Sequence, residues 1–81
     1  MSSFEEYCLK NIGMQIRKYR KQYGYKQEEL SQKFDLNEKY IGHVERCERD
    51  ISLKSLIKIM AFFNIQPREF FNFENEFIWK K

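Results

Sequence analysis

Residues 27–46 read QEELSQKFDLNEKYIGHVER, and their pattern decides the fold. Apolar residues recur at helical intervals on both sides of a tight turn at Asp35 and Leu36. The first helix is expected from Tyr25 to Lys33. The second is expected to follow Asn37, a good N-cap, and to end near Cys47. The stretch therefore predicts two short helices joined by a turn of only two residues.

Two short helices on so tight a turn cross at a wide angle. Ser31 suits such a crossing, because a large side chain at this position would force the two helices apart. The second helix can then be laid into the major groove of DNA, which is about 12 Å wide. This geometry predicts a helix-turn-helix unit.

Three further helices are expected around this unit. Ser2 and Ser3 each stand three residues before a Glu, a capping-box pattern that starts a helix at residue 3 or 4, and Gly24 ends that helix. Ser52 caps a fourth helix that is apolar nearly all round, which predicts a central place in the core. Pro67 stands at the first position of a fifth helix. The prediction is an all-α domain of five helices.

The whole chain, residues 1–81, is short enough to form one domain. Its three Gly and one Pro favour helices over a multistranded sheet. Cys8 and Cys47 lie far apart and the chain has one His, so no metal or other cofactor is expected. Two cysteines without a secretory signal indicate a reducing cytoplasm, and no apolar run is long enough to span a membrane.

The net charge of +3 is small but unevenly placed. Residues 17–26 carry five basic side chains and no acidic one. Such a patch suits a phosphate backbone, but it also suits an ordinary solvated helix face. Charge alone leaves both interpretations open.

Spaced motifs over residues 10–71 resemble the Xre family, the lambda-repressor-like and Cro-like helix-turn-helix regulators. These motifs are Ile12-Gly13-x-x-Ile16-Arg17-x-x-Arg20, Gly24-Tyr25-Lys26-Gln27-Glu28-Glu29-Leu30-Ser31, Tyr40-Ile41-x-x-Val44-Glu45-Arg46 and Ser52-Leu53-x-x-Leu56-x-x-Ile59. Restriction–modification controller proteins are most similar, because they share the third-helix motif and a Lys-Ser-Leu run, here Lys54-Ser55-Leu56. Phage-type repressors are almost as similar. The resemblance implies a lambda-repressor-like fold that binds double-stranded operator DNA and regulates transcription.

The resemblance also assigns roles to single residues. Arg20 and Glu45 match a structural ion pair between the first helix and the end of the third. Gln27 matches a glutamine that contacts phosphate and braces the recognition helix. The base-reading positions of the family correspond to Glu38, Lys39, Tyr40 and His43. Gly42, between them, reads no base but is expected to let the helix approach DNA closely.

Basic and polar side chains around the helix-turn-helix are expected to contact DNA phosphates. They are Lys26, Gln27, Arg46, Arg49, Lys54 and Ser52, the last at the N-terminus of the fourth helix. Lys26 replaces the usual Ser or Thr cap of the second helix, at a cost of about 1 kcal/mol. Cys47 replaces a glycine that is common in the family at a position that often needs the left-handed conformation, which predicts a strained loop.

The C-terminal segment 65–79 is more apolar than one small domain is expected to cover. A homodimer through this segment suits the physics, since two recognition helices about 34 Å apart read successive major grooves. The predicted interface consists of Ile65, Phe70, Phe71, Phe73, Phe77 and Trp79. The alternative is that the part beyond Phe73 folds back on the first helix, over Phe4 and Tyr7.

A second function class fits the same fold: an antitoxin-like or protein-interaction module without specific DNA readout. Binding to promoter DNA that weakens steeply with salt would distinguish the two. An enzyme is not expected, because the sequence has no nucleophile elbow, no glycine-rich phosphate loop and no cluster of metal ligands. RNA polymerase is a further candidate partner, and no small-molecule ligand is evident.

Overall fold

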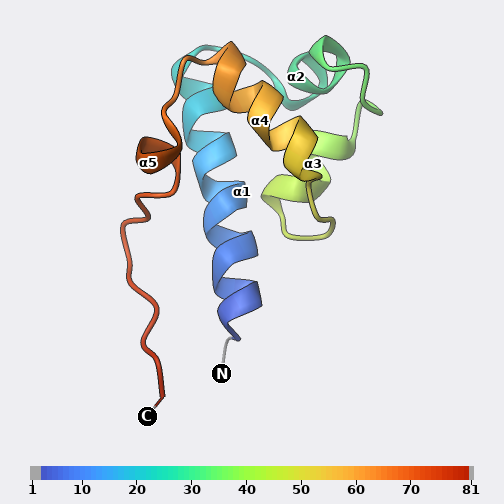
Figure 1. Ribbon diagram of the computed structural model, residues 1–81. Helices are drawn as coiled ribbons and strands as arrows, with labels where there is room; N and C mark the ends of the chain where they lie inside the picture. The colour runs from blue at the N-terminus through green and yellow to red at the C-terminus, as the bar shows by residue number, and fades with distance from the viewer. Residues whose placement is uncertain (1–2, 81) are drawn as a thin grey trace.

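The computed structural model describes residues 3–80, in which five α-helices follow one another as labelled in Figure 1. They are α1 (Phe4–Gln22), α2 (Gln27–Lys33), α3 (Tyr40–Glu45), α4 (Leu53–Phe62) and α5 (Pro67–Phe70). The predicted all-α fold of five helices is confirmed, and the described residues form no strand. None of these helices is long and apolar enough to cross a membrane.

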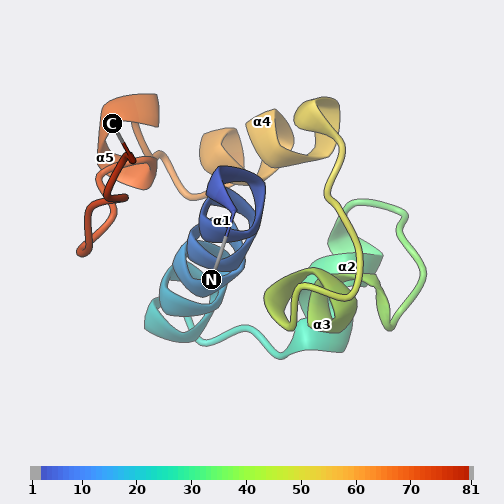
Figure 2. The ribbon, with the colours of Figure 1, turned by 90° about the horizontal axis from the view of Figure 1, so that it is seen from below.

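The long helix α1 is the spine of the molecule, with α2 and α3 on one side and the C-terminal tail on another (Figures 1 and 2). It begins as the capping pattern predicts, because the Ser3 hydroxyl accepts a hydrogen bond from the Glu6 N–H at 3.1 Å. Ser2, the other possible cap, lies outside the described residues. Helix α4 runs from α3 across to the upper end of α1 in Figure 1.

Helices α1 to α4 all end in a Schellman motif, with a left-handed residue directly after the C-cap. The left-handed residues are Gly24, Asp35, Cys47 and Asn64, with φ of 78°, 55°, 61° and 55°. In each case the next N–H reaches back to a carbonyl in the last helical turn, as from Glu48 to His43 at 2.8 Å. Gly, Asp and Asn tolerate this conformation, whereas Cys does so at a cost. The strain predicted at Cys47 is therefore present.

Helices α2 and α3 both begin later than the sequence predicts. The first residue of α2 is Gln27, and Lys26 occupies the N-cap position without a side-chain cap bond. Asn37 is not the N-cap of α3: its Oδ1 accepts from the Lys39 N–H at 2.9 Å and closes a separate turn. This prediction is wrong, because an Asn side chain can hydrogen-bond the backbone two residues on and form a turn instead. Glu38 and Lys39 thus stand on a turn before α3.

The core is formed by ten buried apolar side chains from all five helices and the turn after α4. They are Ile16, Leu30, Ile41, Val44, Leu56, Ile59, Met60, Phe63, Ile65 and Phe70. Helix α4 buries only one face, whereas Leu53 and Ile57 on its other face are 70% and 53% exposed. The predicted central place of α4 in the core is confirmed by Leu56, Ile59 and Met60, but the chain is too short to cover the other side of that helix as well.

The tail, residues 71–80, runs back along α1 without regular secondary structure (Figures 1 and 2). Phe77 packs against Phe4 and Tyr7, with ring centroids 5.1 and 5.4 Å apart, and Trp79 lies 4.6 Å from Phe4. We call the five rings of this contact the aromatic clasp: Phe4, Tyr7, Phe73, Phe77 and Trp79. The Tyr7 hydroxyl also donates to the Asn75 carbonyl. Of the two arrangements expected for the tail, the fold-back over Phe4 and Tyr7 is the one found.

This arrangement changes the surface that segment 65–79 can offer. Ile65 and Phe70 are buried within the single chain, so their assignment to a dimer face is corrected: they are core residues. Phe73 and Phe77 are half-buried in the aromatic clasp. Phe71 and Trp79 remain 44% and 64% exposed.

Candidate nucleic-acid interface

Ser31 joins the two helices of the helix-turn-helix by hydrogen bonds as well as by its small size. Its hydroxyl donates to the Gln27 carbonyl at 3.0 Å and accepts from the Ile41 N–H at 3.2 Å. Ile41 is the second residue of α3, so its N–H has no partner within that helix. Because Ser31 is fully buried, no water can replace this bond. The contact fixes the start of α3 on α2.

Arg20 and Glu45 fix the other end of α3 to α1. The Arg20 Nε and Nη2 donate to the two oxygens of Glu45 at 2.6 and 2.9 Å, and Nη1 donates to the Tyr25 carbonyl at 2.8 Å. The two side chains are only 9% and 1% exposed. A bidentate pair of this kind restrains direction as well as distance. The ion pair implied by the resemblance is thus present and holds α3 at a fixed angle.

Two glycines mark where backbones meet around α3. A Cβ on Gly13 would lie 2.8 Å from the Val44 carbonyl oxygen and 3.0 Å from that of Glu45. A Cβ on Gly42 would lie 2.9 Å from the Gln27 Oε1. Gly42 therefore faces its own chain, and the expectation that it serves close approach to DNA is wrong. Both glycines let α3 pack closely against the helices behind it.

Gln27 braces α3, as the resemblance implies. Its Nε2 donates to the Glu45 Oε1 at 3.0 Å, so it joins the Arg20–Glu45 pair. The side chain is half-buried between α2 and α3. A phosphate contact from the second N–H of the same amide stays a prediction.

The outer face of α3 and the turn before it carry the other predicted base-reading residues. Glu38 and Lys39 are exposed on the turn, and His43 is partly exposed on the helix. Arg46 follows at the end of α3 with 52% of its side chain exposed. Its Nε lies 3.2 Å from a Glu48 carboxylate oxygen. These side chains are thus at least partly accessible, whereas Ile41, Gly42 and Val44 of α3 are buried.

Tyr40 is placed differently from the other predicted base readers. Its hydroxyl donates to the Asp50 carbonyl at 3.3 Å and accepts from the Ser52 N–H at 3.4 Å. The Arg49 guanidinium lies over its ring, 5.1 Å from the centroid. Tyr40 is therefore half-buried and ties the loop between α3 and α4 to α3. A base contact from its ring edge stays a prediction.

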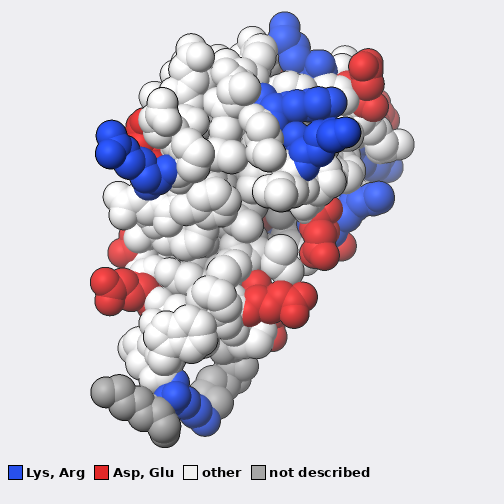
Figure 3. Space-filling model, viewed as in Figure 1, with Lys and Arg blue, Asp and Glu red and all other residues white. Residues whose placement is uncertain are grey.

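The predicted phosphate ligands lie on both sides of α3. Lys26 precedes α2, Arg49 lies in the loop after α3, and Lys54 is in the first turn of α4; all three are exposed. Ser52 caps α4 as predicted, since its hydroxyl accepts from the Ser55 N–H at 3.1 Å. On the face shown in Figure 3, Lys and Arg gather toward the end that carries α2 and α4. The half of the molecule around the helix-turn-helix is thus the one suited to an anion.

Sequence reasoning missed the polar contact that holds α5. The Gln15 Nε2 donates to the Phe70 carbonyl at 2.7 Å, and Gln15 is buried. A glutamine in the middle of α1 gives no local signal for a partner 55 residues away. The contact supplies a donor to a carbonyl at the end of α5, where a helix leaves carbonyls unpaired.

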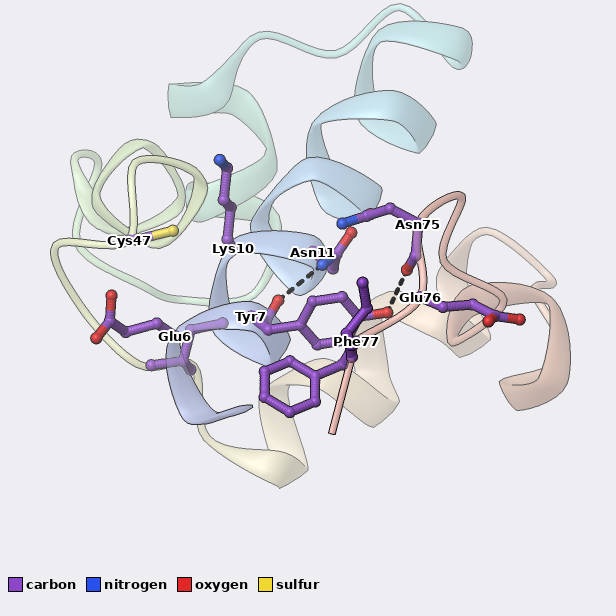
Figure 4. A pocket seen from close by; sticks show the side chains of 10 residues that line it. Glu6, Tyr7, Lys10, Asn11, Cys47, Asn75, Glu76 and Phe77 are labelled. Carbon is purple, nitrogen blue, oxygen red and sulfur yellow. Dashed lines mark hydrogen bonds between the residues drawn. The ribbon is translucent and has the colours of Figure 1, made fainter. Parts of the chain in front are cut away.

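A groove lies beside the aromatic clasp (Figure 4). Cys47 lines one side of it and the tail residues Asn75, Glu76 and Phe77 line the other. Tyr7, Lys10 and Asn11 of α1 lie between them. No group of three or more His, Cys, Asp or Glu residues within 3–80 is arranged to hold a metal ion. The loop after α3 and the tail therefore share one surface of α1.

A family model described as helix-turn-helix matches residues 16–70. Two curated proteins of Archaeoglobus fulgidus, each named an uncharacterized HTH-type transcriptional regulator, are similar to the chain. One is 35% identical over 66 residues, which is 82% of this chain and 94% of the relative. The other is 30% identical over 66 residues, which is 82% of this chain and 93% of the relative.

Solved structures of two restriction–modification controller proteins are similar as well. C.AhdI from Aeromonas hydrophila superposes with a TM-score of 0.70 at 35% identity, over 80% of this chain and 98% of the controller. Wild-type C.Esp1396I superposes with a TM-score of 0.67 at 35% identity, over 78% of this chain and 81% of the controller.

Proposed function

Because the chain belongs to the Xre-like helix-turn-helix family of DNA-binding transcription regulators, we propose that it binds a specific double-stranded operator as a homodimer. We further propose that it acts as the controller protein of a restriction–modification system, with a phage-type repressor as the alternative within the family. Since its proposed target is DNA, we expect the protein to act in the cytoplasm. RNA polymerase is the further partner that activation of a promoter requires.

One observation carries the proposal: buried contacts fix both ends of α3 to α1 and α2, while residues on and before α3 remain exposed. Ser31 fixes its start and the Arg20–Glu45 pair fixes its end, and both contacts are buried. Glu38 and Lys39 are exposed, and His43 is partly exposed. A base-reading element needs this combination, because hydrogen bonds to base edges discriminate only when their donors and acceptors are fixed in place.

We assign complementary roles to the residues around α3. Lys39 donates to guanine O6 or N7, Glu38 accepts from cytosine N4, and His43 donates to a base or a phosphate. The phosphate ligands are Lys26, Gln27, Arg46, Arg49, Lys54 and the N-terminus of α4 at Ser52. Tyr40 contributes by placing Arg49 and Ser52.

The dimer is proposed through Phe71 and Trp79, two of the exposed apolar residues of segment 65–79. Sedimentation of Phe71→Ser and Trp79→Ser tests it, since a polar side chain at a buried interface weakens association. Leu53→Ser and Ile57→Ser on the exposed face of α4 are the matched comparison. Dissociation caused only by the α4 variants would move the interface to α4, and a wild-type monomer at all concentrations would refute the dimer.

The experiment that tests DNA binding is fluorescence anisotropy with duplex DNA from upstream of the protein's own gene, over a series of salt concentrations. The wild-type affinity should fall steeply with salt, because phosphate contacts release counterions. Replacing Lys39, His43 and Arg46 together by Ala should lose most of the affinity. The control variant, Arg68→Ala with Lys80→Ala, loses the same number of positive charges, two, at other positions. It should bind nearly as well as wild type.

Two outcomes would overturn the proposal. An unchanged affinity of the triple variant would show that α3 does not contact the DNA. Absence of any salt-dependent binding would favour the protein-interaction module instead.

A further inference from the structure

Glu48 lies next to two of the residues that are proposed to contact DNA. One oxygen of its carboxylate is 3.2 Å from the Arg46 Nε, and the other is 4.0 Å from the His43 Nε2. The three side chains are between 39% and 55% exposed. An acidic residue thus occupies the place beside Arg46 and His43 that a DNA phosphate is expected to take.

The fold does not depend on this carboxylate. The loop after α3 is closed by backbone bonds, from the Cys47 N–H to the Val44 carbonyl at 3.1 Å and from the Glu48 N–H to the His43 carbonyl at 2.8 Å. An exposed ion pair such as Arg46–Glu48 adds little to stability, because water screens both charges. The buried Glu45, three residues earlier, is the acid that holds α3 in place. The Glu48 side chain therefore has no structural task that its contacts explain.

We propose that Glu48 competes with DNA phosphate for Arg46 and His43, and thereby lowers the affinity of the protein for DNA of any sequence. The proposal rests on the proposed function of α3. When a phosphate approaches, Arg46 must give up its contact with the Glu48 carboxylate. The phosphate contact therefore adds less binding free energy than it would from an Arg without an acidic partner. The carboxylate that is left behind also repels the phosphates nearby.

Such a competitor lowers the affinity of specific and non-specific complexes alike, but only a specific complex keeps contacts that do not involve it. Non-specific binding rests almost wholly on phosphate contacts, which Glu48 weakens. A specific complex has additional hydrogen bonds to base edges from Lys39 and Glu38, which do not involve Glu48. The protein is then released more readily from the large excess of non-operator DNA.

The test compares Glu48→Gln with Glu74→Gln, an exposed acid of the tail, so that the change in net charge is the same. Binding to a duplex of mixed sequence is measured by anisotropy from low to high salt. We expect Glu48→Gln to bind about 3- to 10-fold more tightly than wild type at low salt. The slope of log affinity against log salt concentration should steepen by up to about one, because Arg46 then neutralises a phosphate without competition and releases the counterion of that phosphate. Glu74→Gln should change the affinity less than twofold, because Glu48 and not Glu74 pairs with Arg46 and His43.

The same substitution in an Arg46→Ala variant shows whether Glu48 acts through Arg46. In Arg46→Ala protein, Glu48→Gln should lose most of its effect, with the remainder due to His43 and to direct repulsion between the Glu48 carboxylate and phosphate. An equal gain in both backgrounds, or an equal gain for Glu74→Gln, would overturn the inference and leave DNA binding by α3 intact. If neither wild type nor Glu48→Gln binds any duplex, the proposed function fails and the inference fails with it.

Discussion

The helix-turn-helix and the aromatic clasp are both held against α1, but by different forces. Helix α3 is fixed by buried polar contacts with defined directions, from Arg20 to Glu45 and from Ser31 to Ile41. The clasp is fixed by rings at centroid distances of 4.6 to 6.0 Å that remain partly exposed. Directional contacts set an angle, whereas apolar contacts mainly remove surface from water.

This difference follows what each region has to do. The recognition element must present its side chains at fixed positions, and it lies within the part that matches the family model. The clasp joins the first turns of α1 to the tail, and both segments lie outside residues 16–70. We infer that the clasp stabilises the chain without determining the geometry of α3.

The largest effect is expected from breaking the buried ion pair. Arg20→Ala leaves the Glu45 carboxylate buried with only the Gln27 amide as a side-chain partner. The free energy of unfolding should fall by about 3–5 kcal/mol. Urea denaturation followed by circular dichroism measures it. A loss below about 1 kcal/mol would mean that the pair is not buried as the structure has it.

A smaller loss is expected where α1 and α3 touch. In Gly13→Ala the new methyl group meets the Val44 and Glu45 carbonyls, so the helices must separate, at a cost of about 1–3 kcal/mol. Because α3 moves, DNA affinity should fall as well. The control is Gly24→Ala, which is strained by its φ of 78° but meets no atom within 4 Å. That variant should lose stability and retain its affinity measured well below the unfolding transition.

The clasp should tolerate substitution better than the ion pair. Phe77→Ala removes a half-buried ring that contacts Phe4, Tyr7 and Trp79, and should cost about 1–2 kcal/mol, roughly half the loss for a fully buried Phe. Trp79→Ala, at a more exposed ring, should cost less. Thermal melting of both variants checks the order. A loss for Phe77→Ala as large as for Arg20→Ala would contradict the distinction between the two regions.

The smallest effect is expected at Cys47, which ends α3 and lines the groove beside the clasp. Cys47→Gly should raise the free energy of unfolding by about 1 kcal/mol, because Gly adopts φ of 61° without the penalty of a side chain. Cys47→Ser retains the penalty and should leave stability unchanged. An equal gain in both variants would mean that the thiol, and not the backbone, is responsible.

The sequence predicted those features whose signals are local. The number of helices and the Ser52 cap depend on residues within a few positions of each other, whereas the left-handed position at Cys47 was implied by the resemblance. The ion pair of Arg20 with Glu45 was implied by resemblance, because its two residues are 25 positions apart. Local patterns alone could not have paired them.

Features that depend on distant partners were missed or misplaced. Asn37 is a residue type that commonly caps helices. In the structure α3 begins only at Tyr40, and the bond from the Lys39 N–H to Asn37 closes a turn before it. The role of Gly13 depends on the α3 backbone, and that of Gly42 on the Gln27 side chain. The tail could pack on its own chain or on a second one, since both bury the same rings. Nothing in a single sequence decides between partners of equal apolarity.

The most direct test of the account is a titration of the isotope-labelled protein with duplex DNA from upstream of its own gene, followed by the backbone amide NMR signals. The account predicts that the largest shifts fall on residues 37–54 and on the start of α2. The amide signals of the tail should move little, because the tail is not expected to contact DNA. Shifts concentrated in the aromatic clasp, with those of Lys39, His43 and Arg46 unchanged, would contradict the claim that α3 is the surface that meets DNA.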